Sequence, residues 1–281
     1  MSKYHKKPIT YVDYLSVNVM DLKRSVTFYE KVLGFQVLTR EKNRVVLTAD
    51  GKRPLLILEH PEEVMPKGKR TTGLYHFALL VPERNQLANF LQFLKEHRLT
   101  YGASDHILTE ALYINDPDGN GIEMYYDKKK EDFPGNVDSL EMATLPLDEE
   151  NLLREQDGEW QHLPDGTIIG HIHLHVNDLK EAEEFYVDTL GFSIVAQYPG
   201  ALFISDGGYH HHLGLNVWQG EGAETPPENS VGLNWYTIVL KDKEKREEVV
   251  KRMSANEYFI QQDGEDFLTR DPAGNYIYLF V

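Results

Sequence analysis

Length, composition and charge set the first limits on what this chain can be. It has 281 residues, of which 41% are hydrophobic and 26% charged, and it contains no cysteine. This length suffices for one large or two ordinary globular domains, and the lack of cysteine excludes disulfides, thiol catalysis and thiolate metal sites. The net charge of -16 argues against a nucleic-acid partner, because phosphates need a basic surface.

The hydropathy pattern bears on location and partners. No apolar run reaches the about 18 residues of a membrane span, and the opening MSKYHKKPIT lacks the apolar segment of a signal peptide. We therefore expect a cytoplasmic protein with no membrane partner. The acidic surface identifies no macromolecular partner and leaves the oligomeric state open, with a homo-oligomer as one alternative.

In chain order, four strand-like runs open four similar units, at 11–17, 74–81, 171–176 and 233–240. Each leads into a helix-like stretch, such as 84–97 or 244–253, and then into about three short strands separated by turn signals. In the third unit we expect Asp178 to cap the helix together with Glu181, and Gly191 to end it. The pattern predicts an α+β fold in which one βαβββ unit occurs four times.

The sequence also contains a long internal repeat. DLKRSVTFYEKVLGF at 21–35 returns as DLKEAEEFYVDTLGF at 178–192, and DPDGN at 116–120 returns as DPAGN at 271–275. Long matches in the same order at nearly the same offset indicate an internal duplication. We predict a first domain at 10–128, a linker at 129–167 and a second domain at 168–281. The turn-rich KKKEDFPGN (128–136) and LPDGT (163–167) mark the linker, and LDEENLLREQ is expected to add a short helix to it.

This organisation resembles the vicinal oxygen chelate superfamily, which includes glyoxalase I, bleomycin-resistance proteins and type I extradiol dioxygenases. The resemblance covers nearly the whole chain. It implies four βαβββ modules in two tandem vicinal oxygen chelate domains, whose sheets curl around a metal cavity with ligands on the first and last strands. Fold alone does not decide the function, because the superfamily hosts several chemistries.

Strand alternation indicates which side chains face that cavity. In HIHLHV (171–176) the apolar residues alternate with His171, His173 and His175, which therefore share the opposite face. The same alternation in LYHFALLV (74–81) and GIEMYY (121–126) turns His76 and Glu123 toward the cavity. Two side chains at alternate positions of one strand lie roughly 6.5 Å apart and parallel, so we expect His171 alone of the three to be a ligand.

Comparison of matched positions predicts a single metal site. The first and fourth modules offer only aromatic side chains there: Tyr14, Trp235 and Tyr278. The second and third offer His76, Glu123 and His171, the two-histidine, one-carboxylate set of non-haem Fe(II) oxygenases. The site would be shared between the two halves. In the commoner extradiol arrangement all ligands lie in the carboxy-terminal half, so the pairing of modules stays open.

Further histidines are expected around the site. Alternation in HHHLGLNVW (210–218) turns His210, His212 and Asn216 inward. Glyoxalase-like relatives can draw a fourth ligand from this strand, which makes His212 the alternative ligand. We favour a substrate-binding role for it, together with His173, His175 and Asn216.

The segment DHILTEALYINDPDGNGIE (105–123) resembles the catalytic segment of extradiol dioxygenases, in which a histidine and a tyrosine precede the ligand glutamate. The resemblance implies that His106 donates or accepts a proton and that Tyr113 hydrogen-bonds the substrate. It is strongest to the bacterial two-module catechol 2,3-dioxygenases.

The resemblance therefore implies an extradiol dioxygenase that uses Fe(II) and O2 to open the ring of catechol, or of a substituted catechol, to a 2-hydroxymuconic semialdehyde-type product. Mn(II) or another divalent metal is the alternative cofactor. The alternative functions are a hydroquinone-cleaving dioxygenase, a glyoxalase-type metal-dependent lyase or isomerase, and a non-enzymatic small-molecule binding protein.

Overall fold

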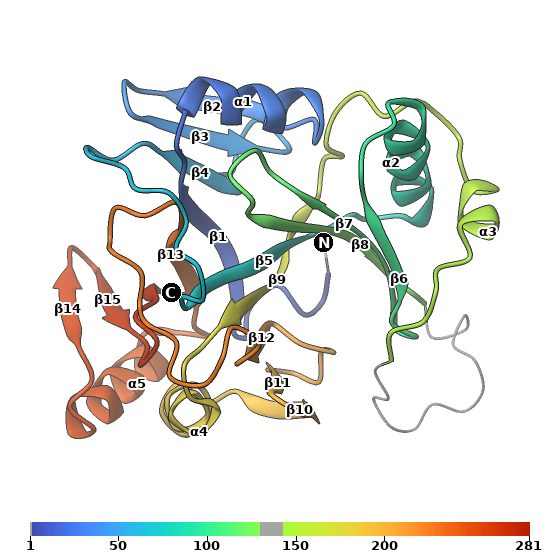
Figure 1. Cartoon of the computed structure of the whole chain (residues 1–281). Coiled ribbons are helices and arrows are strands. Elements are labelled where there is room, and N and C mark those ends of the chain that lie inside the picture. Colours follow the sequence, from blue (N-terminus) through green and yellow to red (C-terminus); the bar gives the residue numbers. More distant parts are fainter. Residues whose placement is uncertain (1, 130–142) are drawn as a thin grey trace.

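Two eight-stranded sheets make up most of the molecule (Figure 1). The computed structural model describes residues 2–129 and 143–281. Residues 130–136 of the turn-rich stretch 128–136, which marks the predicted linker, lie outside the described residues. Among the helices in these two ranges, none is long and apolar enough to cross a membrane.

Four βαβββ modules follow one another along the chain, as predicted. Within each module the first strand pairs in parallel with the last, and the two remaining strands continue the sheet outward. The strands of the first module are β1 (Tyr11–Asn18), β2 (Gln36–Arg40), β3 (Arg44–Thr48) and β4 (Leu56–Glu59). Those of the second are β5 (Gly73–Leu80), β6 (Gly102–Asp105), β7 (Thr109–Asn115) and β8 (Gly121–Asp127).

The second half of the chain repeats this arrangement. The third module contains β9 (Ile168–His175), β10 (Ser193–Tyr198), β11 (Ala201–Ser205) and β12 (Leu213–Asn216). The fourth contains β13 (Gly232–Val239), β14 (Ile260–Asp263), β15 (Asp266–Arg270) and β16 (Tyr276–Phe280).

One helix belongs to each module, and a short one to the linker. They are α1 (Leu22–Lys31), α2 (Arg84–Glu96), α4 (Leu179–Glu183), which continues into a π-helical stretch at Glu184–Leu190, and α5 (Lys243–Ala255); the linker helix is α3 (Glu149–Leu153). The Asp178 carboxylate accepts hydrogen bonds from the backbone N–H groups of Lys180 and Glu181, and Gly191 ends the helical stretch at a φ of 97°. The cap predicted at Asp178 and the helix end predicted at Gly191 are therefore confirmed.

Sheet pairing crosses the two sequence halves. β1 of the first module pairs antiparallel with β13 of the fourth, and β5 of the second pairs antiparallel with β9 of the third. Each sheet thus combines one module from each half. The pairing of modules, which the sequence left open, is therefore first with fourth and second with third. The domain limits at 10–128 and 168–281 remain a prediction from the sequence.

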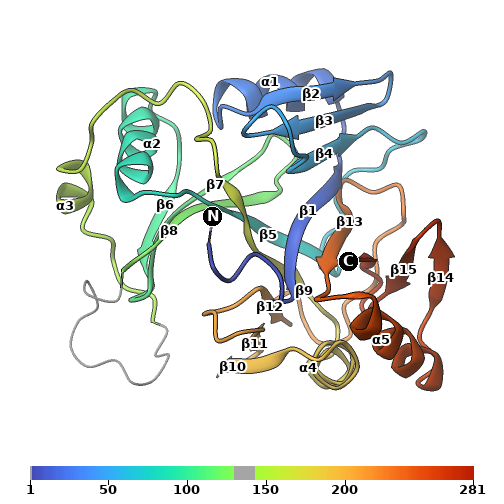
Figure 2. The ribbon, with the colours of Figure 1, turned by 180° about the vertical axis from the view of Figure 1, so that it is seen from behind.

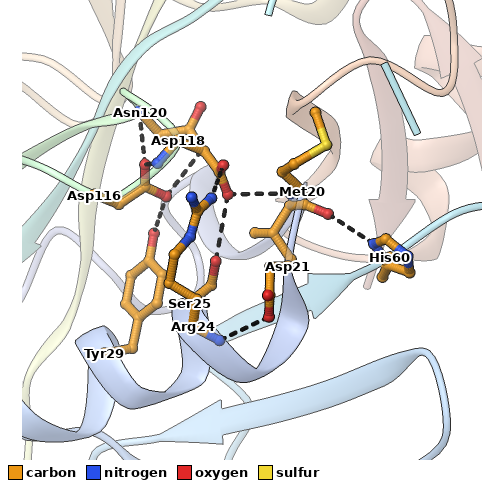
Figure 3. A network of polar contacts seen from close by, with 10 residues as sticks. Met20, Asp21, Arg24, Ser25, Tyr29, His60, Asp116, Asp118 and Asn120 are labelled. Atoms are coloured by element: carbon orange, nitrogen blue, oxygen red, sulfur yellow. Dashed lines mark hydrogen bonds and ion pairs between the residues drawn. The ribbon is translucent and has the colours of Figure 1, made fainter. Parts of the chain in front are cut away.

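The repeated sequence motifs hold neighbouring modules of one half together (Figure 3). The Tyr29 hydroxyl on α1 donates to Asp116 of the DPDGN turn at 3.0 Å, and Asn120 donates to the same carboxylate. Arg24 on α1 forms an ion pair with Asp118 of that turn. A helix of the first module is therefore tied to the end of the second, although the two modules lie in different sheets.

The second half makes the same connection with the equivalent residues. The buried Tyr186 hydroxyl donates to Asp271 of DPAGN at 2.7 Å, and Asn275 donates to the same carboxylate at 2.9 Å. Burial raises the pKa of Asp271, while the hydrogen bonds from Asn275 and Tyr186 act to lower it. Tyr29 and Asp116 in the first half, and Tyr186 and Asp271 in the second, therefore join neighbouring modules.

Candidate metal centre and pocket

Three adjacent strands at the centre of the second sheet bring the predicted ligands together. β8 pairs with one side of β5 and β9 with the other. The register sets Glu123 and His171 on either side of Ala78, and His76 lies at the alternate position of the same strand. Paired and alternate residues share one face of a sheet, and the small Ala78 side chain leaves space between the three.

The three side chains are buried and close together. The Nε2 atoms of His76 and His171 lie 3.0 and 3.1 Å from Oε2 of Glu123. One ligand atom from each residue lies within 4.8 Å of the others, and among the described residues this is the group found suitable for a metal ion. Ligand atoms bound at about 2.1 Å around a first-row metal lie about 3 Å apart, so the spacing fits such an ion.

Unpaired polar atoms at this position also fit a metal. Nε2 of His76 is buried and has no hydrogen-bond partner, despite its short distance to Glu123. A buried polar atom without a partner is costly in a folded protein. A divalent ion among the three side chains would satisfy it, and the donors are those of the facial triad, which leaves open positions for further ligands.

The electrostatics suit metal binding. Burial lowers the pKa of His171 to about 4, although the neighbouring Glu123 acts to raise it, so the imidazole is neutral at pH 7. Burial would raise the pKa of Glu123, but His171 and His76 outweigh this effect and hold it well below its usual value. The site thus offers an ionised carboxylate and a neutral imidazole, the forms in which these side chains bind metals.

The three residues lie in the wall of a cavity of about 450 Å³. His106, Tyr113 and His173 line the same cavity. Its volume lies within the range of small-molecule sites. The structure therefore joins the predicted ligands, both predicted catalytic residues and one of the predicted substrate-binding residues in one pocket.

His106 and Tyr113 form a hydrogen-bonded pair beside the ligand positions. Nδ1 of His106 donates to the carbonyl of Ala143 at 2.8 Å, which leaves Nε2 to accept from the Tyr113 hydroxyl, also at 2.8 Å. Burial and the Glu123 carboxylate raise the pKa of Tyr113 far above its usual value, so the phenol keeps its proton. The pair offers a proton donor and a proton acceptor within reach of a bound molecule.

The predicted substrate-binding residues separate into two groups. His173 lines the pocket, and its Nε2 atom is buried without a hydrogen-bond partner. His175 does not line the pocket; its Nδ1 lies 2.7 Å from Oδ1 of Asn216, and both side chains are buried. Of these three, only His173 can contact a molecule in the pocket directly.

His212 lies away from the pocket, contrary to the sequence-based expectation. Its Nε2 bonds the carbonyl of Tyr4 at 3.0 Å, and its Nδ1 accepts from the backbone N–H of Asp206. β12 begins only at Leu213, so strand alternation does not extend back to residue 212. His212 instead helps to bind the amino-terminal segment, and the structure does not bring it to the metal ligands as a fourth one.

The amino-terminal segment, whose start is marked N in Figure 2, packs against β9, the strand that carries His171. His5 is buried, and its Nε2 lies 2.7 Å from the carbonyl of Gly170, next to the ligand position His171. Burial lowers the pKa of His5 to about 4. The neutral His5 imidazole thus fixes the backbone immediately before His171.

Comparison with protein families shows to which superfamily the chain belongs. The model of the Glyoxalase/Bleomycin resistance protein/Dioxygenase superfamily matches residues 11–124 and 168–278. The chain belongs to this superfamily. It contains two tandem glyoxalase-type domains, as the sequence pattern predicted.

Individual members of the superfamily resemble the chain over nearly its full length. It is 47% identical to catechol-2,3-dioxygenase of Bacillus subtilis over 277 residues, which covers 97% of each chain. A candidate dioxygenase of known structure from Bacillus subtilis is similar with a TM-score of 0.64 at 12% identity, covering 98% of this chain and 86% of that one. Glyoxalase I from Zea mays gives a TM-score of 0.57 at 15% identity, covering 96% and 92%. At such identities the two structures support the fold alone.

The corresponding position in the other sheet holds aromatic rings. The ring of Tyr14 lies 5.7 Å from that of Trp235 in an edge contact, and the Trp235 ring lies 5.2 Å from that of Tyr278. Edge contacts at this distance are favourable between aromatic rings. The first and fourth modules therefore pack these positions against one another, where the second and third keep ligand atoms.

Several other residues that line the pocket were not predicted from the sequence. His211 lines the pocket with its ring 4.1 Å from that of His171, whereas alternation had assigned it to the opposite face. Tyr75, Phe203 and Trp218 also line it and carried no motif. The run of three histidines before β12 was a signal: His210, which alternation turned inward, and His211 both line the pocket, whereas His212 does not.

Proposed function

We propose that this protein is an extradiol dioxygenase that uses Fe(II) and O2 to cleave catechol, or a substituted catechol, next to its two hydroxyl groups. The product would be of the 2-hydroxymuconic semialdehyde type. The observation that carries the proposal is the convergence of His76, Glu123 and His171 in a pocket that also contains the His106–Tyr113 pair. The similarity to a catechol-2,3-dioxygenase over 97% of both chains supports it.

The metal would be held by His76, Glu123 and His171. Bound there, Fe(II) would supply a Lewis acid with open positions for both diol oxygens and for dioxygen. Mn(II) prefers the same ligands and is the alternative.

The protein's own side chains would handle the protons. The Tyr113 phenol, kept protonated by burial and by Glu123, has its oxygen lone pairs available to accept a hydrogen bond from a hydroxyl group of the substrate. Nε2 of His106 accepts from that phenol, so a proton leaving the substrate can pass through the Tyr113 hydroxyl to His106. The Ala143 carbonyl holds the imidazole in the tautomer that this step requires.

His173 would orient the bound molecule. Its Nε2 atom has no partner within the protein and lies in the pocket wall, and its ring contacts that of His76 at 5.0 Å. A hydrogen bond to substrate would satisfy this atom and hold the ring beside the metal ligands. The deep end of the pocket thus combines metal ligands, a proton path and a positioning group.

The test is oxygen consumption by protein loaded anaerobically with Fe(II). The proposal predicts O2 uptake with catechol and a yellow ring-fission product. Glu123→Gln should abolish both, whereas Tyr278→Phe, a substitution at the matched position of the other sheet, should leave both intact. Turnover of a methylglyoxal–thiol adduct without O2 use would overturn the proposal in favour of a glyoxalase-type enzyme. Cleavage of hydroquinone but not of catechol would replace the substrate.

A further inference from the structure

The pocket changes character from its floor to its mouth. The ligand residues and the hydrogen-bonding groups lie at the buried end. Tyr75, Tyr198 and Trp218 also line the pocket, yet they are 41%, 39% and 53% exposed. Large aromatic side chains that gather in the open are typical of a surface that binds a ligand.

These rings form a continuous wall from the mouth to the site. The Trp218 ring lies 5.5 Å from that of Tyr75 and 5.3 Å from that of His173. The Phe203 ring lies 5.5 Å from the same histidine and 5.8 Å from the Tyr198 ring. A molecule whose polar end binds at the ligands would place its other end against this wall.

Charge is nearly absent from the lining. Among the described residues that line the pocket, Glu123 is the one aspartate, glutamate, lysine or arginine. A carboxylate on the substrate would find no lysine or arginine among these described lining residues, and the Glu123 carboxylate together with a deprotonated diol would already balance the charge of the bound Fe(II). An unpaired charge in such surroundings is strongly disfavoured. The net charge of -16 also disfavours the approach of an anion.

The cavity is larger than catechol needs. Its volume of about 450 Å³ equals that of about 15 water molecules in the liquid. Catechol has only eight non-hydrogen atoms, so space remains for a ring substituent. Ser104, Leu108 and Thr109, which also line the cavity, are uncharged as well.

We propose that this pocket selects catechols with an uncharged, apolar ring substituent and rejects those with a carboxylate, and that Trp218 and Tyr198 set this preference. The substituent would lie against the aromatic wall while the diol is held at the buried end. This inference rests on the proposed function and narrows its substrate class.

Binding without turnover gives the first test. Fe(II)-loaded protein is titrated calorimetrically under anaerobic conditions with 4-ethylcatechol, catechol and 3,4-dihydroxybenzoate. We expect 4-ethylcatechol to bind about 10-fold more tightly than catechol, and the acid at least about 100-fold more weakly. Failure of 4-ethylcatechol to bind, or equal binding of the acid, would overturn the proposal. In air, the kcat/KM values should follow the same order.

Two substitutions separate wall contacts from charge. Trp218→Ala should lower the ratio of kcat/KM for 4-ethylcatechol to that for catechol by about 3–10-fold. Tyr198→Arg should raise the relative use of 3,4-dihydroxybenzoate by about 10-fold or more, whereas the matched control Tyr198→Met should not. Unchanged ratios in both Trp218→Ala and Tyr198→Arg would overturn the assignment of these residues.

The outcomes distinguish the two proposals. If the protein consumes no O2 with any catechol, the proposed function fails and the preference fails with it. If catechol is cleaved while 3,4-dihydroxybenzoate is used equally well or better, the dioxygenase proposal stands and the preference alone is wrong.

Discussion

Gly170 immediately precedes the ligand position His171 and has no room for a side chain. A Cβ atom at this position would lie 2.6 Å from Cζ and 2.8 Å from Cε1 of Tyr125. Tyr125 is fully buried, and its hydroxyl lies 2.6 Å from that of Tyr209. Gly170→Ala therefore forces a buried ring to move and breaks or lengthens that hydrogen bond.

The cost follows from these two effects. Overpacking of a buried site costs about 1–3 kcal/mol, and the lost hydrogen bond about 1 kcal/mol. Alanine offsets about 0.4–1 kcal/mol by restricting the unfolded chain. We therefore expect Gly170→Ala to lower the free energy of unfolding by about 1–3.5 kcal/mol and, because His171 follows directly, to weaken Fe(II) binding.

Chemical denaturation of metal-free protein measures the first effect, because bound metal would add its own stabilisation. Gly102→Ala is the matched control, since a Cβ atom there meets Tyr113 at an ordinary 3.6 Å, also within a strand. The control should be at least as stable as the wild type. Equal stability of both variants would refute the steric reasoning for Gly170.

Three further predictions concern the tie between modules, the amino-terminal segment and the metal. Tyr186→Phe should cost about 1–3 kcal/mol in thermal or chemical unfolding, because buried Asp271 loses a hydrogen-bond donor; a change below about 0.5 kcal/mol would contradict the role given to this contact. The folded pKa of His5 is about 4, below the unfolded value of 6.5, so the unfolded state takes up the proton first and stability falls as pH drops from 6.5 to 4, by roughly 3 kcal/mol in total. His5→Gln should lose correspondingly less stability than the wild type over this range. The measurement is the free energy of unfolding of both proteins by chemical denaturation at pH 7 and at pH 4.5. An equal loss in the two proteins would show that His5 does not titrate as described. His76→Ala should lose its Fe(II) on gel filtration, as measured by metal analysis, whereas Trp235→Phe at the matched position should add no metal and lose none; retention by His76→Ala would contradict its role as a ligand.

Side-chain alternation within a strand predicted the face of the candidate ligands correctly where the residues lie inside a regular strand. His76, Glu123 and His171 could be selected because alternation assigns a face and the duplication supplies matched positions for comparison. His212 differs because the chain bends before β12, so its side chain follows no alternation and bonds Tyr4 instead.

Long-range pairing could not be read from the sequence. Neither β5 nor β9 carries a signal for its partner, since any two strands of suitable length can pair, and the choice depends on how whole modules pack. The aromatic mouth was missed for a related reason. Tyr75 and Trp218 look like ordinary apolar residues until the sheets bring them together over the pocket.

An anomalous difference map at the iron edge, from crystals of protein loaded anaerobically with Fe(II), tests the central claim most directly. The account predicts one strong peak about 2.0–2.2 Å from the ligand atoms of His76, Glu123 and His171. A peak elsewhere, for example between Asp127 and His210, which lie 3.0 Å apart, or none at these three residues, would contradict it.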